Sequence, residues 1–171
     1  MGYTIEQARA LLGSSKLKEA GKAIDSLLGK DKNNDELWYL RGIVSLRLKN
    51  YDNAHECFEQ ATWINKKSLY FKMMGLAHME MYEFDDAVED FEHALSLQKK
   101  DASLNFYLSV CYLFLNDLRG KKQLQVAYSI DKKKTKRLAE DFYTIFFKSE
   151  RTLNEKIKQE IERTISSIKI V

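Results

Sequence analysis

The sequence predicts an all-α fold built from stacked helix–turn–helix repeats. Two segments, 50–61 and 83–94, are near-copies of one another at an offset of 33 residues. A period of about 34 residues is typical of helical hairpins that bury their apolar faces against neighbouring copies. Proline is absent and glycine is infrequent along the 171 residues, so no composition typical of a flexible linker interrupts the array.

The two central repeats share a pattern of large and small residues. The pattern comprises Trp38, Gly42, Leu46, Tyr51, Ala54, Phe58 and Ala61 in one repeat, and Phe71, Gly75, Met79, Phe84, Ala87, Phe91 and Ala94 in the next. It resembles the tetratricopeptide repeat, in which small residues let paired helices approach and aromatic residues fill the gaps between hairpins. The resemblance implies a right-handed αα superhelix, a solenoid whose first helices line a concave groove and whose second helices form the convex surface.

Weaker copies of this pattern extend the array in both directions. We expect a degenerate first repeat at 1–34, clear repeats at 35–67 and 68–100, and a divergent repeat at 101–133. In the divergent repeat, Gly120, Leu124 and Ala127 fit the second helix only if the turn is one residue shorter. Asp35, Ser68 and Asp101 are predicted N-caps, because their side-chain oxygens can accept hydrogen bonds from the first turn of a helix.

Residues 134–171 leave the repeat pattern and predict C-terminal capping helices. One apolar stripe comprises Leu138, Phe142, Ile145 and Phe146, and a second comprises Leu153, Ile157, Ile161, Ile165 and Ile168. The segment 135–148 is expected to seal the apolar end of the array. The last helix, 151–169, has three alternative roles: it lengthens the cap, packs in the groove, or pairs with a second copy of the chain.

Composition and motifs argue against several classes of protein. No apolar run approaches the roughly 18 residues that a membrane span needs, and the N-terminus lacks the pattern of a secretory signal, so a cytoplasmic location is expected. Cys57 and Cys111 lie far apart in sequence and are expected to be buried packing residues rather than a disulfide or zinc ligands. A phosphate-binding loop and the common hydrolase motifs are also missing. The sequence therefore predicts neither an enzyme nor a bound cofactor.

The histidines give no metal motif. His55, His78 and His93 fall in three unrelated places in the sequence. Glu89 and His93 share a helical face at the spacing i, i+4, but two ligands without a third are more often an ordinary surface pair. No metal site is predicted.

The resemblance places a set of first-helix residues toward the groove, and the set is mainly aromatic and aliphatic. It comprises Arg9, Tyr39, Ile43, Leu46, Lys72, Leu76, Met79, Phe106, Val110 and Leu113. Such a surface suits an amphipathic helix or an extended apolar segment of a partner protein. Stripes of this kind are also typical of core residues, so both interpretations stay open. We expect a non-catalytic scaffold or adaptor that binds a partner segment in the groove.

Three alternatives concern other partners. Co-chaperones of this family bind the acidic tails of heat-shock proteins through a clamp of several cationic and amide side chains, but here only Lys72 and Arg9 could contribute, so the clamp is not matched. Lysine pairs at 66–67, 99–100 and 132–133 would form a basic ridge, yet the net charge is only +3 and stacking aromatics are missing, which argues against nucleic acid. A homo-oligomeric assembly protein that self-associates through 151–171 or the groove is the alternative function.

Overall fold

The computed structural model describes residues 2–146 and, in the C-terminal segment, residues 155, 157, 159, 160, 162 and 163. The helices are α1 (Ile5–Gly13), α2 (Leu17–Leu28), α3 (Asp35–Arg47), α4 (Tyr51–Ile64), α5 (Ser68–Glu80), α6 (Phe84–Leu97), α7 (Ala102–Phe114), α8 (Arg119–Ile130) and α9 (Lys132–Phe146). All regular secondary structure among the described residues is α-helical, so the predicted all-α class is confirmed. No helix in this part of the chain combines the length and the apolar character that crossing a bilayer requires.

Part of the predicted C-terminal stripes lies outside the described residues. This applies to Leu153, Ile161, Ile165 and Ile168, to most of the predicted helix 151–169, and to the side chains of Ile145 and Phe146. The six described residues of the C-terminal segment are helical.

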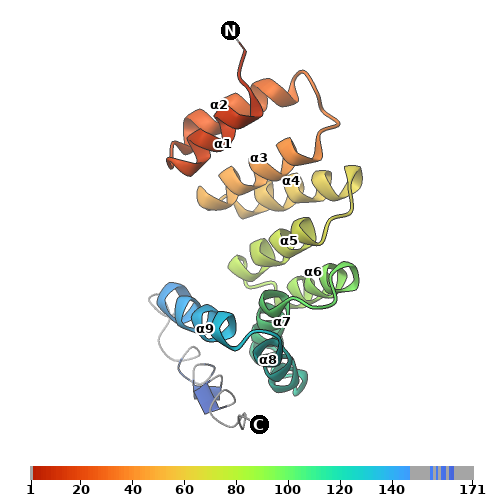
Figure 1. Cartoon of the computed structure of the whole chain (residues 1–171), viewed down its shortest axis with the longest axis vertical. Helices are drawn as coiled ribbons and strands as arrows, with labels where there is room; N and C mark the ends of the chain where they lie inside the picture. Colours follow the sequence, from red (N-terminus) through yellow and green to blue (C-terminus); the bar gives the residue numbers. More distant parts are fainter. Residues whose placement is uncertain (1, 147–154, 156, 158, 161, 164–171) are drawn as a thin grey trace. The chain divides into compact units, whose positions relative to one another are not determined.

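The helices form two compact units, Met1–Glu83 and Phe84–Val171, called unit 1 and unit 2. In unit 1, α1 pairs with α2, α3 packs on α2 and pairs with α4, and α5 packs on α4 (Figure 1). In unit 2, α6 packs against α7, α7 pairs with α8, and α9 contacts both α7 and α8. Each unit therefore repeats the contact that the sequence pattern predicts, in which a helix pairs with its neighbour along the chain.

The turns that follow α1, α3, α5 and α7 share one backbone geometry. In each turn a residue other than glycine adopts the left-handed conformation: Ser15 (φ 59°), Lys49 (φ 60°), Tyr82 (φ 63°) and Asn116 (φ 55°). The N–H of the next residue donates to the carbonyl five residues earlier at 2.8 to 3.0 Å, the 6→1 hydrogen bond of the Schellman motif. The divergent first and fourth hairpins thus keep the turn of the central repeats.

The fourth hairpin is not shortened at its turn, which corrects the prediction. Asn116 occupies the same place in its turn as Lys49 does in the second hairpin. The difference comes afterwards, because the buried residue Gly120 lies four positions after Asn116, whereas the buried Ala54 lies five positions after Lys49. The buried face of α8 therefore begins one residue early relative to Asn116, although the segment between the two helices, 115–118, is one residue longer than the segment 48–50 between α3 and α4.

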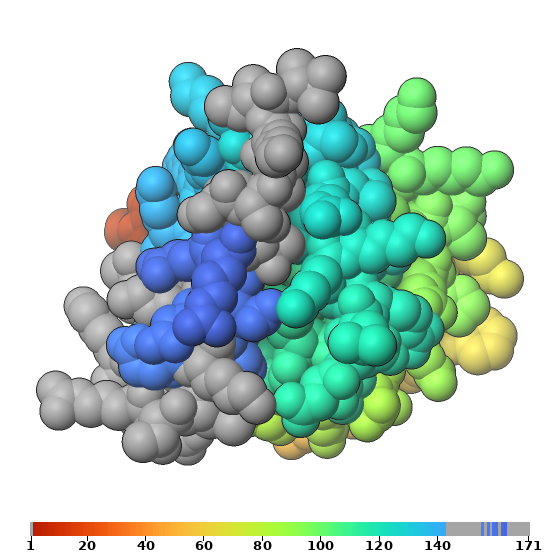
Figure 2. Space-filling model, turned by 90° about the horizontal axis from the view of Figure 1, so that it is seen from below, coloured from red at the N-terminus to blue at the C-terminus, as the bar shows by residue number. Residues whose placement is uncertain are grey.

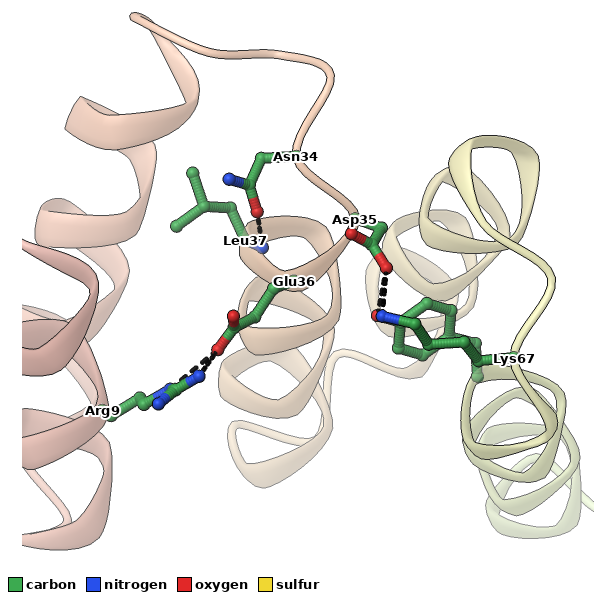
Figure 3. A network of polar contacts seen from close by, with 7 residues as sticks. Arg9, Asn34, Asp35, Glu36, Leu37 and Lys67 are labelled. Atoms are coloured by element: carbon green, nitrogen blue, oxygen red, sulfur yellow. Dashed lines mark hydrogen bonds and ion pairs between the residues drawn. The ribbon is translucent and has the colours of Figure 1, made fainter.

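The predicted N-caps are correct for one helix and wrong for two. Asp101 caps α7, and its carboxylate accepts hydrogen bonds from two backbone N–H groups at 2.7 and 3.2 Å. Asp35 and Ser68 are instead the first residues of their helices, so the caps fall one position earlier, at Asn34 for α3 and Lys67 for α5. Lys67 makes no side-chain capping bond, and the Asn34 side chain accepts one at 3.2 Å (Figure 3).

Close helix approach within a hairpin depends on a glycine. A Cβ atom at Gly42 of α3 would lie less than 3 Å from three atoms of the Phe58 ring on α4. In the fourth hairpin the small residue is on the other helix, because a Cβ atom at Gly120 of α8 would lie 2.8 Å from the Leu113 side chain of α7. Either arrangement lets one helix press a large side chain onto the backbone of its partner.

Two buried serines differ in how their hydroxyls are satisfied. Ser45 Oγ accepts from the Arg41 guanidinium at 2.9 Å and donates to Asn53 Oδ1 at 2.7 Å. Ser109 is fully buried, and its Oγ has no hydrogen-bond partner among the described residues. A buried hydroxyl without a partner loses its hydration without compensation.

The Gly42→Ala variant is expected to lower the free energy of unfolding by about 2 kcal/mol, because the added methyl group overlaps the Phe58 ring and forces the hairpin apart. Urea denaturation followed by circular dichroism measures the change. Gly13→Ala is the matched control, since nothing lies within 4 Å of a Cβ atom there, and it should leave stability unchanged or raise it by up to about 1 kcal/mol. Equal effects of the two variants would contradict the packing argument.

The Ser109→Ala variant is expected to raise the free energy of unfolding by about 1 kcal/mol, because it removes an unsatisfied buried hydroxyl. Ser45→Ala should lower it by about 1 to 2 kcal/mol, because the Asn53 side chain loses the nearer of its two donors and the Arg41 side chain loses an acceptor. Thermal and urea unfolding of both variants check the opposite signs. A loss of stability in Ser109→Ala would show that its hydroxyl is satisfied.

Candidate functional site

Six of the predicted groove residues lie on the first helices of unit 1 and keep part of their surface accessible. We call them the first-helix surface of unit 1: Arg9 on α1, Tyr39, Ile43 and Leu46 on α3, and Lys72 and Leu76 on α5. The three α3 residues recur at i, i+4 and i+7, so they share one helical face. They are half-buried and pack against the core cluster of Ala54, Phe58 and Met74. The core therefore holds the inner side of each side chain and leaves the outer side accessible.

Tyr39 joins α3 to the helices beside it. Its ring centroid lies 5.5 Å from that of Tyr70 on α5 and 6.1 Å from that of Phe58 on α4. Burial raises the pKa of the Tyr39 phenol, and the opposing influence of the Arg47 guanidinium is weaker. The phenol is therefore neutral at physiological pH. Its hydroxyl has no hydrogen-bond partner in the described part of the chain, which leaves it able to bind a polar group of a ligand.

A polar network fixes α3 to the start of α5 next to this ring. The carboxylate of Asp35 accepts hydrogen bonds from Lys67 Nζ and from the Tyr70 hydroxyl, each at 2.6 Å (Figure 3). Burial opposes ionisation of Asp35, but these two bonds outweigh it and lower the pKa of the carboxyl. The hydrogen bond to Asp35 raises the pKa of Lys67 to about 12, so the pair stays charged through neutral pH. Tyr70 is thereby locked in the orientation in which it supports Tyr39.

Some of the cationic side chains on and beside this surface have carboxylate partners and others do not. The Arg9 guanidinium pairs with the Glu36 carboxylate and links α1 to α3 (Figure 3). Lys72 is half-buried and has no ion-pair partner among the described residues. Arg47 donates to the backbone carbonyl of Leu12 at 2.9 Å but likewise has no carboxylate partner in this part of the chain. The charge left uncompensated on the first-helix surface of unit 1 is therefore positive.

Three of the other four predicted groove residues are buried. Met79 is 1% exposed, and Phe106 and Val110 are 0% exposed. Within unit 2, the Phe106 ring meets the Phe142 ring of α9 edge-on at 6.2 Å, so α9 covers this face of α7. Residues as enclosed as these offer no surface to a partner.

Leu113 lies beside the C-terminal segment of unit 2. It lines a cavity of about 220 Å³ whose other walls include Leu118 and the buried Ile157. Glu160 pairs with Lys121 of α8 at 2.8 Å, and Figure 2 shows the described C-terminal residues against the atoms of this helix. These contacts place the described part of the last helix on the α7–α8 hairpin.

Two of the three histidines are neighbours, which corrects the interpretation that they are unrelated. The ring centroids of His55 on α4 and His78 on α5 lie 4.4 Å apart. The two residues are far apart in sequence, so spacing rules for metal motifs did not detect them. The repeat register could have done so, because the second helix of one repeat packs on the first helix of the next.

The cysteines and the basic ridge add no reactive site. Cys57 and Cys111 are buried, as predicted, and burial raises the pKa of the Cys57 thiol to about 11, so it is not a nucleophile at neutral pH. Within the ridge, Lys67 is paired with Asp35, and Lys134 Nζ lies 3.9 Å from Asp101 Oδ1. Part of the ridge's charge is therefore already compensated by acidic residues of the same chain.

Comparison with known proteins places the repeats in one family. Tetratricopeptide repeat models match residues 35–62 and residues 73–101. No curated protein matches the chain in sequence. Since tetratricopeptide repeats are interaction modules, these matches support a protein-interaction scaffold.

Solved structures show the same fold at low identity. The crystal structure of MamA is 15% identical with a TM-score of 0.72, and the match covers 97% of each chain. MamA 41-end from Desulfovibrio magneticus RS-1 is 16% identical with a TM-score of 0.70, and the match covers 96% of this chain and 94% of that one. YrrB, a repeat protein of this kind with an unusual peptide-binding site, is 19% identical with a TM-score of 0.68. The match covers 96% of this chain and 86% of that one. The chain thus contains two tetratricopeptide repeats, matched at 35–62 and 73–101, within an all-α helical-repeat fold.

Proposed function

We propose that the chain is a non-catalytic scaffold that binds a segment of a partner protein on the first-helix surface of unit 1. The observation that carries the proposal is the combination of half-buried apolar side chains with uncompensated positive charge on one face. Tyr39, Ile43 and Leu76 supply apolar contact area, while Lys72 and Arg47 lack carboxylate partners among the described residues. A short segment with apolar residues on one side and aspartate or glutamate beside them matches both features.

The rigidity of the surface supports the same function. Tyr39 packs against Phe58 and Tyr70, and the Tyr70 hydroxyl is held by Asp35. A side chain held in this way has lost most of its rotamer freedom before a ligand arrives, so binding costs the protein little ordering free energy. Aromatic residues in such positions commonly supply much of the binding energy of an interface. YrrB, which has the same fold, has a peptide-binding site, and a peptide is the ligand that we propose here.

Leu76→Glu is expected to weaken peptide binding by about thirtyfold or more, because a carboxylate replaces an apolar contact of the proposed surface. Peptides selected from a random twelve-residue library against the full chain provide the ligands, and fluorescence anisotropy measures the affinities. Leu48→Glu is the matched control, since Leu48 is 49% exposed and lies at the C-cap of α3, outside the surface. Selected peptides that bind Leu76→Glu as tightly as the unchanged chain would exclude the proposed site.

The same variants separate partner binding from self-association. Sedimentation equilibrium of the full chain gives its mass as a function of concentration. A dimer that dissociates in Leu76→Glu but persists in Leu48→Glu would assign the surface to a second copy of the chain, in place of a foreign segment. A monomer in all three samples agrees with the proposal.

Lys72→Met is expected to reduce binding of acidic selected peptides by about five- to tenfold and to leave neutral apolar peptides nearly unaffected. Methionine keeps the length and the apolar stem of lysine but removes the charge. Binding measured at two salt concentrations checks the origin of the effect, because only the charge-dependent part should weaken with salt. An equal loss for acidic and neutral peptides would instead assign Lys72 a packing role.

A further inference from the structure

A cleft of about 520 Å³ lies in unit 1 between α2, α3, α4 and the loop that precedes α3. Its apolar walls are Leu28 of α2, Trp38 of α3 and Cys57 of α4. The volume falls within the range of about 300 to 1,000 Å³ that is usual for small-molecule pockets. The described residues that line the cleft include none of the first-helix surface of unit 1. The cleft is therefore separate from the proposed peptide site.

The Trp38 ring is a fixed wall of this cleft. Its indole N–H donates to the backbone carbonyl of Lys32 at 2.8 Å, which holds the loop against the ring. The ring also packs against the core cluster that includes Ile24 and Leu28. Because Trp38 is only half-buried, part of the ring remains accessible. A planar group of a ligand can pack on such a preformed aromatic surface with little ordering cost to the protein.

A chain of hydrogen bonds links the polar residues of the cleft. Asp25 Oδ1 accepts from Arg41 Nε at 2.7 Å. Arg41 Nη1 donates to Ser45 Oγ at 2.9 Å, and this hydroxyl donates to Asn53 Oδ1 at 2.7 Å. Since the serine hydroxyl accepts from the guanidinium, its single proton is the one that Asn53 receives. The amide oxygen of Asn53 is thereby fixed toward Ser45, and the amide nitrogen is left for another partner.

The cleft presents donors that lack acceptors. Arg41 Nη2 and Asn53 Nδ2 have no hydrogen-bond partner in the described part of the chain, and Lys32 has no ion-pair partner there. Asp25 is the acidic residue among the described residues that line the cleft, and it already pairs with Arg41. Two cations against one carboxylate leave a net positive charge. The cleft is therefore complementary to an anion.

We propose that this cleft binds a small planar carboxylate, with its ring against Trp38 and its oxygens facing Arg41, Asn53 and Lys32. Hydrogen bonds from a guanidinium or an ammonium group to a carboxylate are charge-assisted and stronger than neutral ones. The planar guanidinium also matches the planar geometry of a carboxylate. A neutral apolar ligand would cover the same donors without pairing them, which costs binding free energy.

Titration of the isotope-labelled full chain with benzoate, followed by proton–nitrogen correlation NMR, tests the cleft. The chain has two tryptophans, so Trp63→Phe identifies the indole N–H signal of Trp38. Trp63 is 77% exposed and does not line the cleft. We expect the Trp38 signal to shift with a Kd of about 1 mM. Benzamide, which has the same ring without the charge, should bind about tenfold more weakly or worse.

Variants of the two cations assign the charge recognition. Arg41→Met is expected to weaken benzoate binding by about tenfold or more and Lys32→Met by about threefold, and both should leave benzamide binding nearly unchanged. Lys30→Met is the matched control, because Lys30 is exposed in the same loop but does not line the cleft. It should bind benzoate as the unchanged chain does. Circular dichroism verifies that each variant is folded.

Three results would overturn the proposal. The first is an unchanged Trp38 signal at about a tenfold excess of benzoate over the expected Kd. The second is equal binding of benzamide and benzoate, which would assign the cleft to apolar packing alone. The third is an equal loss in Lys30→Met and Lys32→Met, which would indicate a general effect of surface charge. If Arg41→Met folds poorly, Lys32→Met still decides, because Lys32 is an exposed loop residue.

Discussion

The close approach of paired helices is the constraint on which the rest of the structure depends. It requires one helix to present backbone where the other presents a large side chain, as Gly42 does against Phe58. Once this contact is made, the ring of Phe58 is fully buried and becomes part of the core on which Tyr39, Ile43 and Leu46 rest. The accessible face of α3 therefore owes its geometry to a glycine on another side of the same helix. In the fourth hairpin the contact is inverted, because Gly120 of α8 presents backbone to the Leu113 side chain of α7.

The same register along the first helices leads to different surroundings in the two units. The Tyr39 ring in unit 1 packs against the rings of Phe58 and Tyr70 and remains partly accessible. Phe106 in unit 2 occupies the corresponding helical position but is enclosed, with the Phe142 ring of α9 against it. Surface for a partner is thus limited by what the C-terminal helix already covers. Unit 1 has both half-buried apolar side chains and cations without carboxylate partners among the described residues, which is why we propose the peptide site there.

Much of the fold could be predicted from the sequence because it depends on periodicity. The near-copies around Ala54 and Ala87 indicate two helical hairpins, and the turn geometry at Ser15 and Asn116 shows that the degenerate flanking copies fold in the same way. Local details were less predictable. Asp35 has the chemistry of an N-cap, but Asn34 stands one position earlier and takes that role, which frees the Asp35 carboxylate for Lys67. Propensity cannot choose between two adjacent capping residues, because both stabilise a helix start.

The site was harder to predict because it depends on contacts between repeats. A helical register tells which face Phe106 occupies, but not that α9 covers that face. The meeting of His55 and His78 follows from the packing of α4 on α5, which the repeat register indicates but which spacing rules for metal motifs do not consider. The lack of an ion-pair partner for Lys72 among the described residues is equally a property of its surroundings, since the sequence contains many acidic residues that could have paired with it. Composition therefore identifies the kind of protein, and the contacts between helices determine what it can bind.

The four left-handed turn residues have a consequence for how the array can be rearranged. Serine, lysine, tyrosine and asparagine occupy the same position with the same backbone hydrogen bonds, so the turn does not depend on the identity of that side chain. The chain can consequently be divided at equivalent turn positions, such as Lys49 and Tyr82, into segments that begin and end in the same backbone conformation. Duplication or exchange of such a module would preserve the direction of the chain at each junction. The turns thus provide natural joints at which arrays of this type can lengthen, shorten or recombine.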